Sequence, residues 1–336
     1  MSTAVVPSDL GKIRGLQRVT SAAGFFEICA LDHLSDFAEL LAPDPLSVSF
    51  ADVVTAKDAL VRALSPSVSA WLLDARYGLQ AVATGALPGT VGLMSTIEDE
   101  DYSIPEGPRR TRYREGWSLR QIKLAGADVA KLLWFYRPDG DAATAEHQRY
   151  VVRTLADECA RLSLPLVVEP IWYPLPGEDP ASARWRAARV DGILASAFEA
   201  NSLGVDMLKV EFPGYVDSQQ GRDNAAAACK ELDTGVSVPW VILSAGVGYA
   251  DFKIQVEIAC RAGASGYLAG RSIWRDAVST HDCAAREAAV AEARARLDEL
   301  NAITRANGRP YVAARSLPDV LDTMPDGWFR SWHPAG

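Results

Sequence analysis

Two lysines lie inside apolar stretches that are typical of buried β-strands. Arginine outnumbers lysine 27 to 7 in this chain, so each lysine is an informative choice. Lys131 lies in the segment VAKLLWF and Lys209 in VDMLKVE, whereas the other five lysines fall in segments that we expect to be exposed. A buried ammonium group must be paired or deprotonated. The pattern therefore predicts either a structural lysine–carboxylate pair, with Glu169 or Asp32 as counter-ion, or a reactive amine.

A lysine is a nucleophile only in its neutral form. At the unperturbed pKa of about 10.4, only about one side chain in 2,500 is neutral at pH 7. A pKa near 7 requires the ammonium to be destabilised by about 4 to 5 kcal/mol, and a second ammonium about 6 Å away supplies about 3 kcal/mol of this. If Lys131 and Lys209 face one interior, desolvation supplies the rest. The free amine then attacks a ketone and forms a Schiff base, an electron sink that permits C–C cleavage.

Two carboxylates are expected beside these lysines. Glu169, in the segment VVEPIWY, ends the apolar run that precedes the run of Lys209. Its apolar neighbours are expected to raise its pKa toward the range of a general acid or base. Asp32 ends the first apolar run of the chain. We expect Asp32 to orient or neutralise an amine, or alternatively to cap the segment that follows it.

Eight apolar runs alternate with longer helical patterns along nearly the whole chain. The runs span residues 24–32, 70–74, 90–94, 129–135, 165–170, 205–211, 239–244 and 265–270, and the helical patterns span 55–64, 118–125, 142–162, 181–201, 222–232, 251–262 and 286–307. Near-continuous apolar strands of this length are typical of a parallel sheet buried on both faces. Eight strands with their crossovers predict an α/β fold, a single (β/α)8 TIM barrel. An open doubly wound sheet is the alternative, although no GxGxxG follows the first run.

Short glycine-containing segments follow the last two apolar runs. Ser244, Ala245 and Gly246 follow the seventh run, and Gly270 and Arg271 end and follow the eighth. In a (β/α)8 barrel the loops after strands seven and eight form the usual phosphate site, where backbone N–H groups meet the anion. The guanidinium of Arg271 would add a bidentate contact. These segments predict a phosphorylated substrate.

Nothing in the sequence separates a second domain. Residues 1–310 are expected to form one barrel and residues 311–336 an irregular C-terminal extension, whose Trp328, Phe329 and Trp332 would dock on the barrel or on a neighbouring subunit. A second irregular stretch, Glu98–Tyr113 (EDEDYSIPEGPRRTRY), is expected to be a solvated loop whose acidic and basic halves pair, or alternatively a lid over the substrate.

Composition and charge exclude several classes of protein. Of 336 residues, 49% are hydrophobic and 23% charged, and the net charge is −9. An acidic chain without a basic stripe argues against nucleic-acid binding. The absence of a long apolar stretch argues against a membrane span, and an odd number of cysteines without a CxxC pair fits a cytoplasmic protein. The four histidines are dispersed, so a metal site is not expected. No other cofactor is expected either.

Six segments of the chain resemble the class I tagatose 1,6-bisphosphate aldolase family. They are LLDARYG (72–78), AKLLWFY (130–136), VEPIWY (168–173), VDMLKVEFP (205–213), VPWVILSAGV (238–247) and GASGYLAGRSIW (263–274). The second half is equally similar to the related sulfofructose-phosphate aldolases. The resemblance covers residues 20–310. It implies a metal-independent barrel enzyme that reversibly cleaves a ketose 1-phosphate into dihydroxyacetone phosphate and an aldehyde.

The resemblance also implies roles for individual residues. Lys209 matches the family's Schiff-base lysine and Glu169 its proton-shuttling glutamate, while Lys131 and Asp32 match accompanying active-site positions. The segments that hold the phosphate in the family are matched by Ser244, Ala245, Gly246, Gly270 and Arg271.

The chain departs from the family after the first strand. The family typically has Asp-Gln-Arg there, whereas this chain has Asp32-His33-Leu34. The missing arginine removes a handle for the anionic end of the aldehyde fragment. We therefore expect a ketose 1-phosphate with a different, less charged tail, which His33 would contact.

Two other functions are compatible with the same residues. One is a phosphate-binding barrel lyase or isomerase that uses Glu169 and Lys209 as acid and base without a covalent intermediate. The other is a metabolite-sensing regulator that keeps the pocket but not the turnover. A homo-oligomer is expected only from the fold class.

Overall fold

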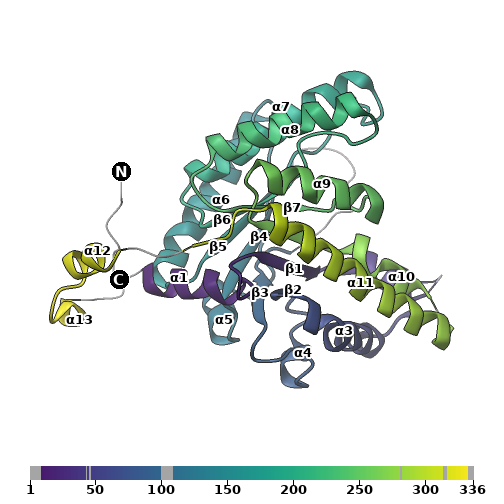
Figure 1. The fold of residues 1–336 in the computed structure, drawn as a ribbon, viewed down its shortest axis with the longest axis horizontal. Coiled ribbons are helices and arrows are strands. Elements are labelled where there is room, and N and C mark those ends of the chain that lie inside the picture. The colour runs from purple at the N-terminus through teal and green to yellow at the C-terminus, as the bar shows by residue number, and fades with distance from the viewer. Residues whose placement is uncertain are drawn as a thin grey trace.

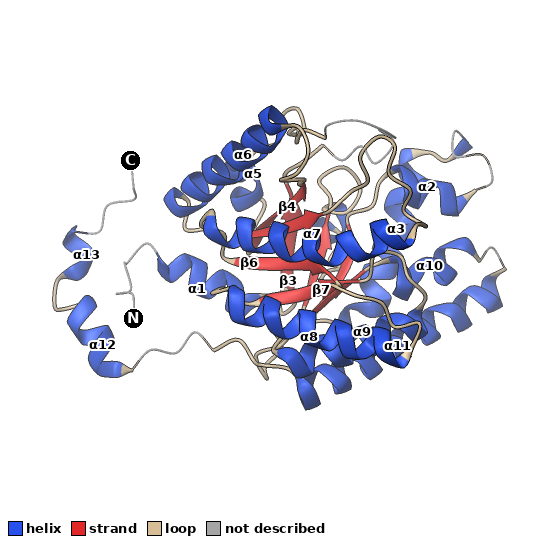
Figure 2. Ribbon diagram, turned by 90° about the horizontal axis from the view of Figure 1, so that it is seen from above, coloured by secondary structure: helices blue, strands red, loops and turns tan. Residues whose placement is uncertain are grey.

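The centre of the molecule is a closed barrel of eight parallel strands that pair in chain order, β1 to β8 (Figure 2). The computed structural model describes residues 9–42, 44, 47–99, 109–280, 282–312 and 316–331. The strands are β1 (Phe26–Leu31), β2 (Ala70–Leu73), β3 (Gly92–Thr96), β4 (Val129–Phe135), β5 (Leu166–Ile171), β6 (Met207–Glu211), β7 (Trp240–Leu243) and β8 (Gly266–Ala269). The barrel closes where β1 pairs with β8, with Phe26 opposite Gly266. The predicted (β/α)8 fold is confirmed.

Helices surround the barrel (Figure 1). Those that overlap the predicted helical patterns are α3 (Phe50–Leu64), α5 (Leu119–Leu124), α6 (Ala142–Arg161), α7 (Ala183–Ser202), α8 (Gln219–Gly235), α9 (Tyr249–Ala262) and α11 (Cys283–Asn307). Those that were not predicted are α1 (Asp9–Arg18), α2 (Ser35–Leu41), α4 (Gln80–Ala83), α10 (Arg271–Ser279), α12 (Leu317–Thr323) and α13 (Trp328–Ser331), and a short 3-10 helix spans Ser65–Ser67. In the part of the chain described here, none of these helices is long and apolar enough to cross a bilayer.

Polar residues begin many of the helices. Ser118, Asp141, Ser182 and Ser218 each accept a hydrogen bond from the third amide of the helix that follows them. Such caps satisfy backbone donors that a helix leaves unpaired at its start. They fix where each strand-to-helix connection ends, and therefore the geometry of the loops at the carboxyl ends of the strands.

Two apolar layers hold the barrel. The larger layer lies between the sheet and its helices and contains, for example, Leu132, Val210 and Trp240. The smaller layer fills the lower interior of the barrel, with Val129 from β4 and Met207 from β6 among its members. Alternate residues of a strand face the same side. The residues two positions further along β4, β5 and β6 therefore face the interior one layer above this apolar plug.

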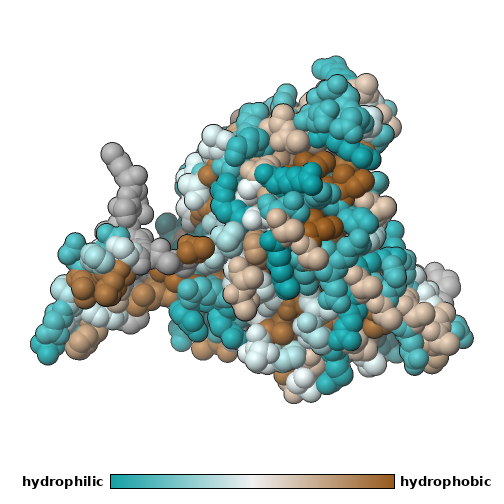
Figure 3. All heavy atoms as spheres, in the orientation of Figure 1, coloured by the Kyte–Doolittle hydropathy of each residue, from teal (hydrophilic) through white to brown (hydrophobic). Residues whose placement is uncertain are grey.

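The C-terminal extension is helical in part. α12 and α13 lie apart from the barrel, on the side where α1 lies (Figures 1 and 2). Leu317, Leu321 and Phe329 of these helices are more than half exposed, and Figure 3 shows hydrophobic residues on the surface of this arm. Of the three aromatic residues predicted to dock, Trp328 and Phe329 pack against each other, and Trp332 lies outside the described residues.

Candidate active site

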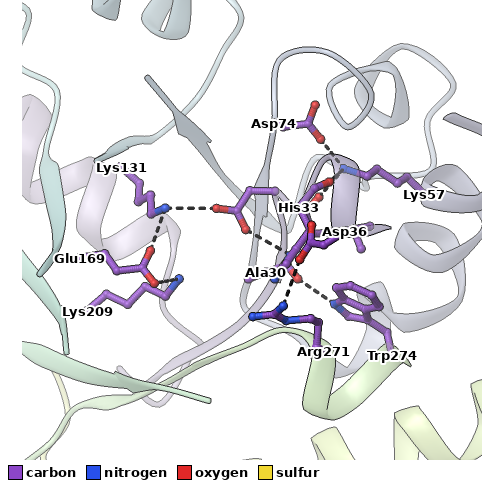
Figure 4. A network of polar contacts seen from close by, with 12 residues as sticks. Ala30, His33, Asp36, Lys57, Asp74, Lys131, Glu169, Lys209, Arg271 and Trp274 are labelled. Atoms are coloured by element: carbon purple, nitrogen blue, oxygen red, sulfur yellow. Dashed lines mark hydrogen bonds and ion pairs between the residues drawn. The ribbon is translucent and has the colours of Figure 1, made fainter. Parts of the chain in front are cut away.

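Lys131, Glu169, Lys209 and Asp32 converge in the barrel interior, above the apolar plug (Figure 4). The two oxygens of Glu169 contact different lysines: Oε2 lies 2.7 Å from Lys131 Nζ and Oε1 lies 2.8 Å from Lys209 Nζ. Asp32 Oδ2 lies 3.2 Å from Lys131 Nζ. One carboxylate therefore stands between the two ammonium groups that were expected to repel each other directly.

The two lysines have different surroundings. The Lys131 side chain is fully buried, and its Nζ contacts carboxylates from Asp32, Glu98 and Glu169. The ammonium donates hydrogen bonds to Asp32 and Glu98, and Glu169 completes the group as an ion pair. Lys209 is 7% exposed and, among the described residues, has Glu169 as its ion-pair partner. Lys131 thus lies among three carboxylates, whereas the described residues place one carboxylate against Lys209.

Asp32 is ionised in this cluster. Burial alone would raise its pKa, but the charges of Lys131 and Lys209 outweigh burial and hold the pKa of Asp32 well below its ordinary value. The alternative role for Asp32, as the cap of the following segment, is wrong. The residue that precedes α2 is Leu34, and no side chain caps this helix. Asp32 belongs to the lysine cluster instead, because its carboxylate caps no amide of α2 and accepts a hydrogen bond from Lys131.

Glu98 is a member of the cluster that the sequence did not reveal. It was assigned to a solvated loop, but its side chain is only 3% exposed and its Oε1 lies 2.9 Å from Lys131 Nζ. An antiparallel bridge between Glu98 and Tyr113 holds it there. At the base of this loop the amide of Asp99 donates to the carbonyl of Arg112. This backbone contact does not test the predicted pairing of the loop's acidic and basic side chains. A lid was suggested for the whole stretch Glu98–Tyr113, and residues 100–108 of it lie outside the described residues.

The segment after β7 forms a tight turn. The amide of Val247 donates to the carbonyl of Ser244 across 2.9 Å, and the two central residues, Ala245 and Gly246, have φ angles of 47° and 75°. A positive φ is unusual for alanine, and such strained backbone concentrates at functional sites. Two amides in a turn of this kind are free to face an anion.

The segment after β8 lies beside this turn. A Cβ atom added to Gly246 would come within 3.6 Å of Arg271 Nη2, and one added to Gly270 would come within 2.9 Å of the His33 ring. Gly270 precedes α10, whose N-terminus carries the partial positive charge that favours anions. Arg271 Nη1 lies 3.1 Å from Asp36 Oδ2. The structure thus brings together all the segments predicted to hold phosphate.

His33 lies between the two halves of the site. Its ring packs edge-on against Trp274, with ring centroids 5.1 Å apart, and its Nδ1 lies 3.6 Å from Asp32 Oδ1. Burial lowers the pKa of His33 to about 3, and the cations of Arg271 and Lys209 add to this effect while Asp32 opposes it. His33 is therefore neutral at physiological pH and brings no positive charge to the site.

The fold and the site together define a class of enzyme: a closed parallel barrel whose interior holds two buried lysines with a carboxylate between them. The sequence profile of the DeoC/LacD family aldolases matches residues 31–276. The chain belongs to this family, and it is an aldehyde-lyase.

The names of two curated relatives are consistent with this assignment. Tagatose 1,6-diphosphate aldolase 1 of Enterococcus faecalis is 28% identical over 310 residues, which cover 88% of this chain and 94% of the relative. Tagatose 1,6-diphosphate aldolase 1 of Streptococcus mutans is 27% identical over 314 residues and is covered to 96%. The family resemblance seen in the sequence is confirmed.

Solved structures share the fold. An archaeal fructose 1,6-bisphosphate aldolase superposes with a TM-score of 0.60 at 18% identity, covering 86% of this chain and 99% of that chain. The fructose-bisphosphate aldolase of Plasmodium falciparum superposes with a TM-score of 0.66 at 14% identity, covering 92% and 98%.

Proposed function

We propose that the chain is a class I aldolase in which Lys209 forms a Schiff base with a ketose 1-phosphate. The observation that carries this proposal is the 2.8 Å contact between Lys209 Nζ and Glu169 in the barrel interior. The amine adds to the C2 carbonyl, and loss of water gives the iminium. Removal of the C4 hydroxyl proton then breaks the C3–C4 bond. This releases an aldehyde and leaves an enamine, which is protonated and hydrolysed to dihydroxyacetone phosphate.

The contacts of the two lysines support this choice of nucleophile. Three carboxylates hold the proton of Lys131 in place, so that its nitrogen has no lone pair to offer. Lys209 must also lose a proton before it reacts. The charges of the cluster do not favour this loss, because three carboxylates face two ammonium groups and stabilise the ammonium form. Among the described residues, Glu169 is the carboxylate in contact with Lys209. We assign to it the protons moved during imine formation and C–C cleavage.

The phosphate of the substrate is proposed to bind where β7 and β8 end. The turn of Ser244, Ala245 and Gly246 and the start of α10 at Gly270 supply backbone amides, and Arg271 supplies a guanidinium. Asp36 accepts from Arg271 across 3.1 Å, so an incoming phosphate would compete with a carboxylate for this side chain. No metal or other cofactor is needed for these steps.

The test of this function is chemical trapping. We expect borohydride reduction in the presence of dihydroxyacetone phosphate to leave a covalent adduct on Lys209, identified by peptide mass spectrometry. An adduct on Lys131 would exchange the roles of the two lysines. A folded protein that binds the ligand without forming any adduct would contradict the covalent mechanism and favour acid–base catalysis or a sensing role.

The distal end of the substrate is a separate proposal. The relatives act, by their names, on tagatose 1,6-diphosphate, but His33 is neutral because burial lowers its pKa to about 3. A neutral imidazole supplies no positive charge to balance a phosphate at the distal end of the substrate. We therefore expect the kcat/KM for a 6-deoxy ketose 1-phosphate to equal or exceed that for the 1,6-bisphosphate. A strong preference for the bisphosphate in steady-state assays would contradict this proposal.

The setting of the enzyme is proposed from the same chain. We place it in the cytoplasm, because all five cysteines are free and four of them are buried. We propose that it acts there on phosphorylated sugars. Burial raises the pKa of the Cys159 thiol to about 12, and a thiol in that state is unreactive.

A further inference from the structure

Lys57 corrects the expectation that five of the seven lysines are exposed. Its side chain, which comes from α3, is fully buried. Nζ donates to the carbonyl oxygen of Leu31 across 2.8 Å, to that of His33 across 2.7 Å, and to the Asp74 carboxylate. All three donors of the ammonium are thereby satisfied. Two of the three acceptors are backbone carbonyls of the connection that follows β1.

Asp74 is held as firmly as Lys57. Its Oδ1 accepts from the amides of Arg76 and Tyr77, across 2.8 and 2.7 Å, in the turn that follows β2. The ring of Tyr77 lies beside the ammonium of Lys57, with 5.6 Å between Nζ and the ring centroid. This turn belongs to LLDARYG, one of the six segments that resemble the family. None of its residues lies in the cluster of Lys131, Glu169, Lys209 and Asp32. The segment anchors Lys57.

The two carbonyls held by Lys57 flank Asp32. In an extended chain, carbonyls two residues apart point the same way. Fixing those of Leu31 and His33 therefore fixes the direction of the side chain between them. That side chain reaches Lys131, with 3.2 Å between Asp32 Oδ2 and Nζ. Figure 4 shows Lys57 and Asp74 on the far side of this connection from Lys131 and Glu169.

We propose that Lys57 and Asp74 are positioning residues. They fix the connection after β1 so that the Asp32 carboxylate keeps its contact with Lys131 Nζ. The same connection reaches the phosphate side, because the His33 ring packs against Gly270 and Asp36 pairs with Arg271. One buried ion pair outside the site thus sets the geometry of both halves. The inference rests on the proposed function, since it concerns the geometry of that site.

The test needs a variant that folds. Lys57→Met alone would strand the buried Asp74 carboxylate, which is strongly destabilising. The double variant Lys57→Met/Asp74→Asn leaves no stranded charge and keeps an oxygen for the two amides. Its matched control is Lys12→Met/Asp206→Asn. In that pair Lys12 Nζ lies 2.9 Å from Asp206 Oδ2, at the start of β6, and Asp206 likewise accepts a backbone amide, that of Leu166.

We expect the Lys57/Asp74 double variant to lower kcat about 100-fold, the scale of a displacement of about 1 Å in a catalytic group, with KM changed less than about threefold. The control is expected to keep the wild-type kcat. Equal kcat values in the two double variants, at matched thermal stability, would overturn the proposal.

A second readout does not depend on turnover. In protein labelled with ¹⁵N-lysine, only seven side chains give ammonium signals. The Lys131 signal should shift in the Lys57/Asp74 variant and stay in place in the control. An unshifted Lys131 signal would overturn the positioning role, whatever the mechanism of the enzyme. A missing borohydride adduct on the wild-type protein would contradict only the proposed function.

Discussion

Lys209→Met is expected to abolish turnover, lowering kcat by about four orders of magnitude or more, the scale seen when a covalent nucleophile is removed. Methionine has nearly the length of lysine but no amine, so neither carbinolamine nor imine can form. Glu169 keeps its 2.7 Å partner, Lys131, so the variant is not left with an unpaired carboxylate. The checks are steady-state cleavage of a ketose 1-phosphate and borohydride trapping, both of which should fail while the melting temperature is retained.

Lys131→Met is the control that separates the two lysines. It removes the cation from between Asp32, Glu98 and Glu169. Loss of one partner from a buried ion pair destabilises a protein by about 3 to 5 kcal/mol, so a lower melting temperature is expected here but not for Lys209→Met. Trapping should still modify Lys209. A Lys209→Met protein that cleaves substrate and is trapped at Lys131 would reverse the assignment.

Much of the site was predictable because strand periodicity carries it. Lys131 follows Val129 by two residues and Lys209 follows Met207 by two, so in a barrel all four side chains face the interior. The apolar members fill the lower layer and the lysines the layer above. The glycine-containing segments could be placed for the same reason, since strand order alone brings the ends of β7 and β8 together.

Glu98 could not be recognised because its burial is not local. It stands in a run of acidic residues just after β3, a composition typical of a solvated loop. It is buried only because the chain returns at Tyr113 to pair with it. Its position two residues beyond the strand end was the available signal, since that is where catalytic side chains of a barrel lie.

Lys57 did leave a signal in the sequence. It lies four residues after Val53 and four before Val61, on the apolar face of α3. A lysine on such a face is buried together with it, but its acceptors could not be named, because the carbonyls of Leu31 and His33 belong to a connection whose path depends on the packing of α2 and α10. Short helices such as α2 were missed for a related reason, since packing rather than intrinsic propensity stabilises them.

Glu169→Gln is expected to separate imine formation from C–C cleavage. Glutamine keeps the size of the side chain and an oxygen that can accept from Lys131, but it cannot take up the proton that leaves the C4 hydroxyl. We expect kcat for cleavage to fall by about two to four orders of magnitude, the usual contribution of a general acid or base. Exchange of the substrate-derived proton of dihydroxyacetone phosphate with deuterated water should fall in parallel, because the enamine is protonated by the same group.

Trapping at Lys209 provides the contrast in this variant. With dihydroxyacetone phosphate and borohydride, Glu169→Gln should still yield the adduct, more slowly, since the amine remains and only its proton acceptor is lost. The ratio of trapping rate to cleavage rate therefore rises relative to wild type. If cleavage persists within about tenfold of wild type, the proton passes through another carboxylate of the cluster, either Asp32 or Glu98, and the assignment to Glu169 is wrong. A fall of both rates by the same factor would instead indicate that Glu169 acts only by holding Lys209 in place across their 2.8 Å contact.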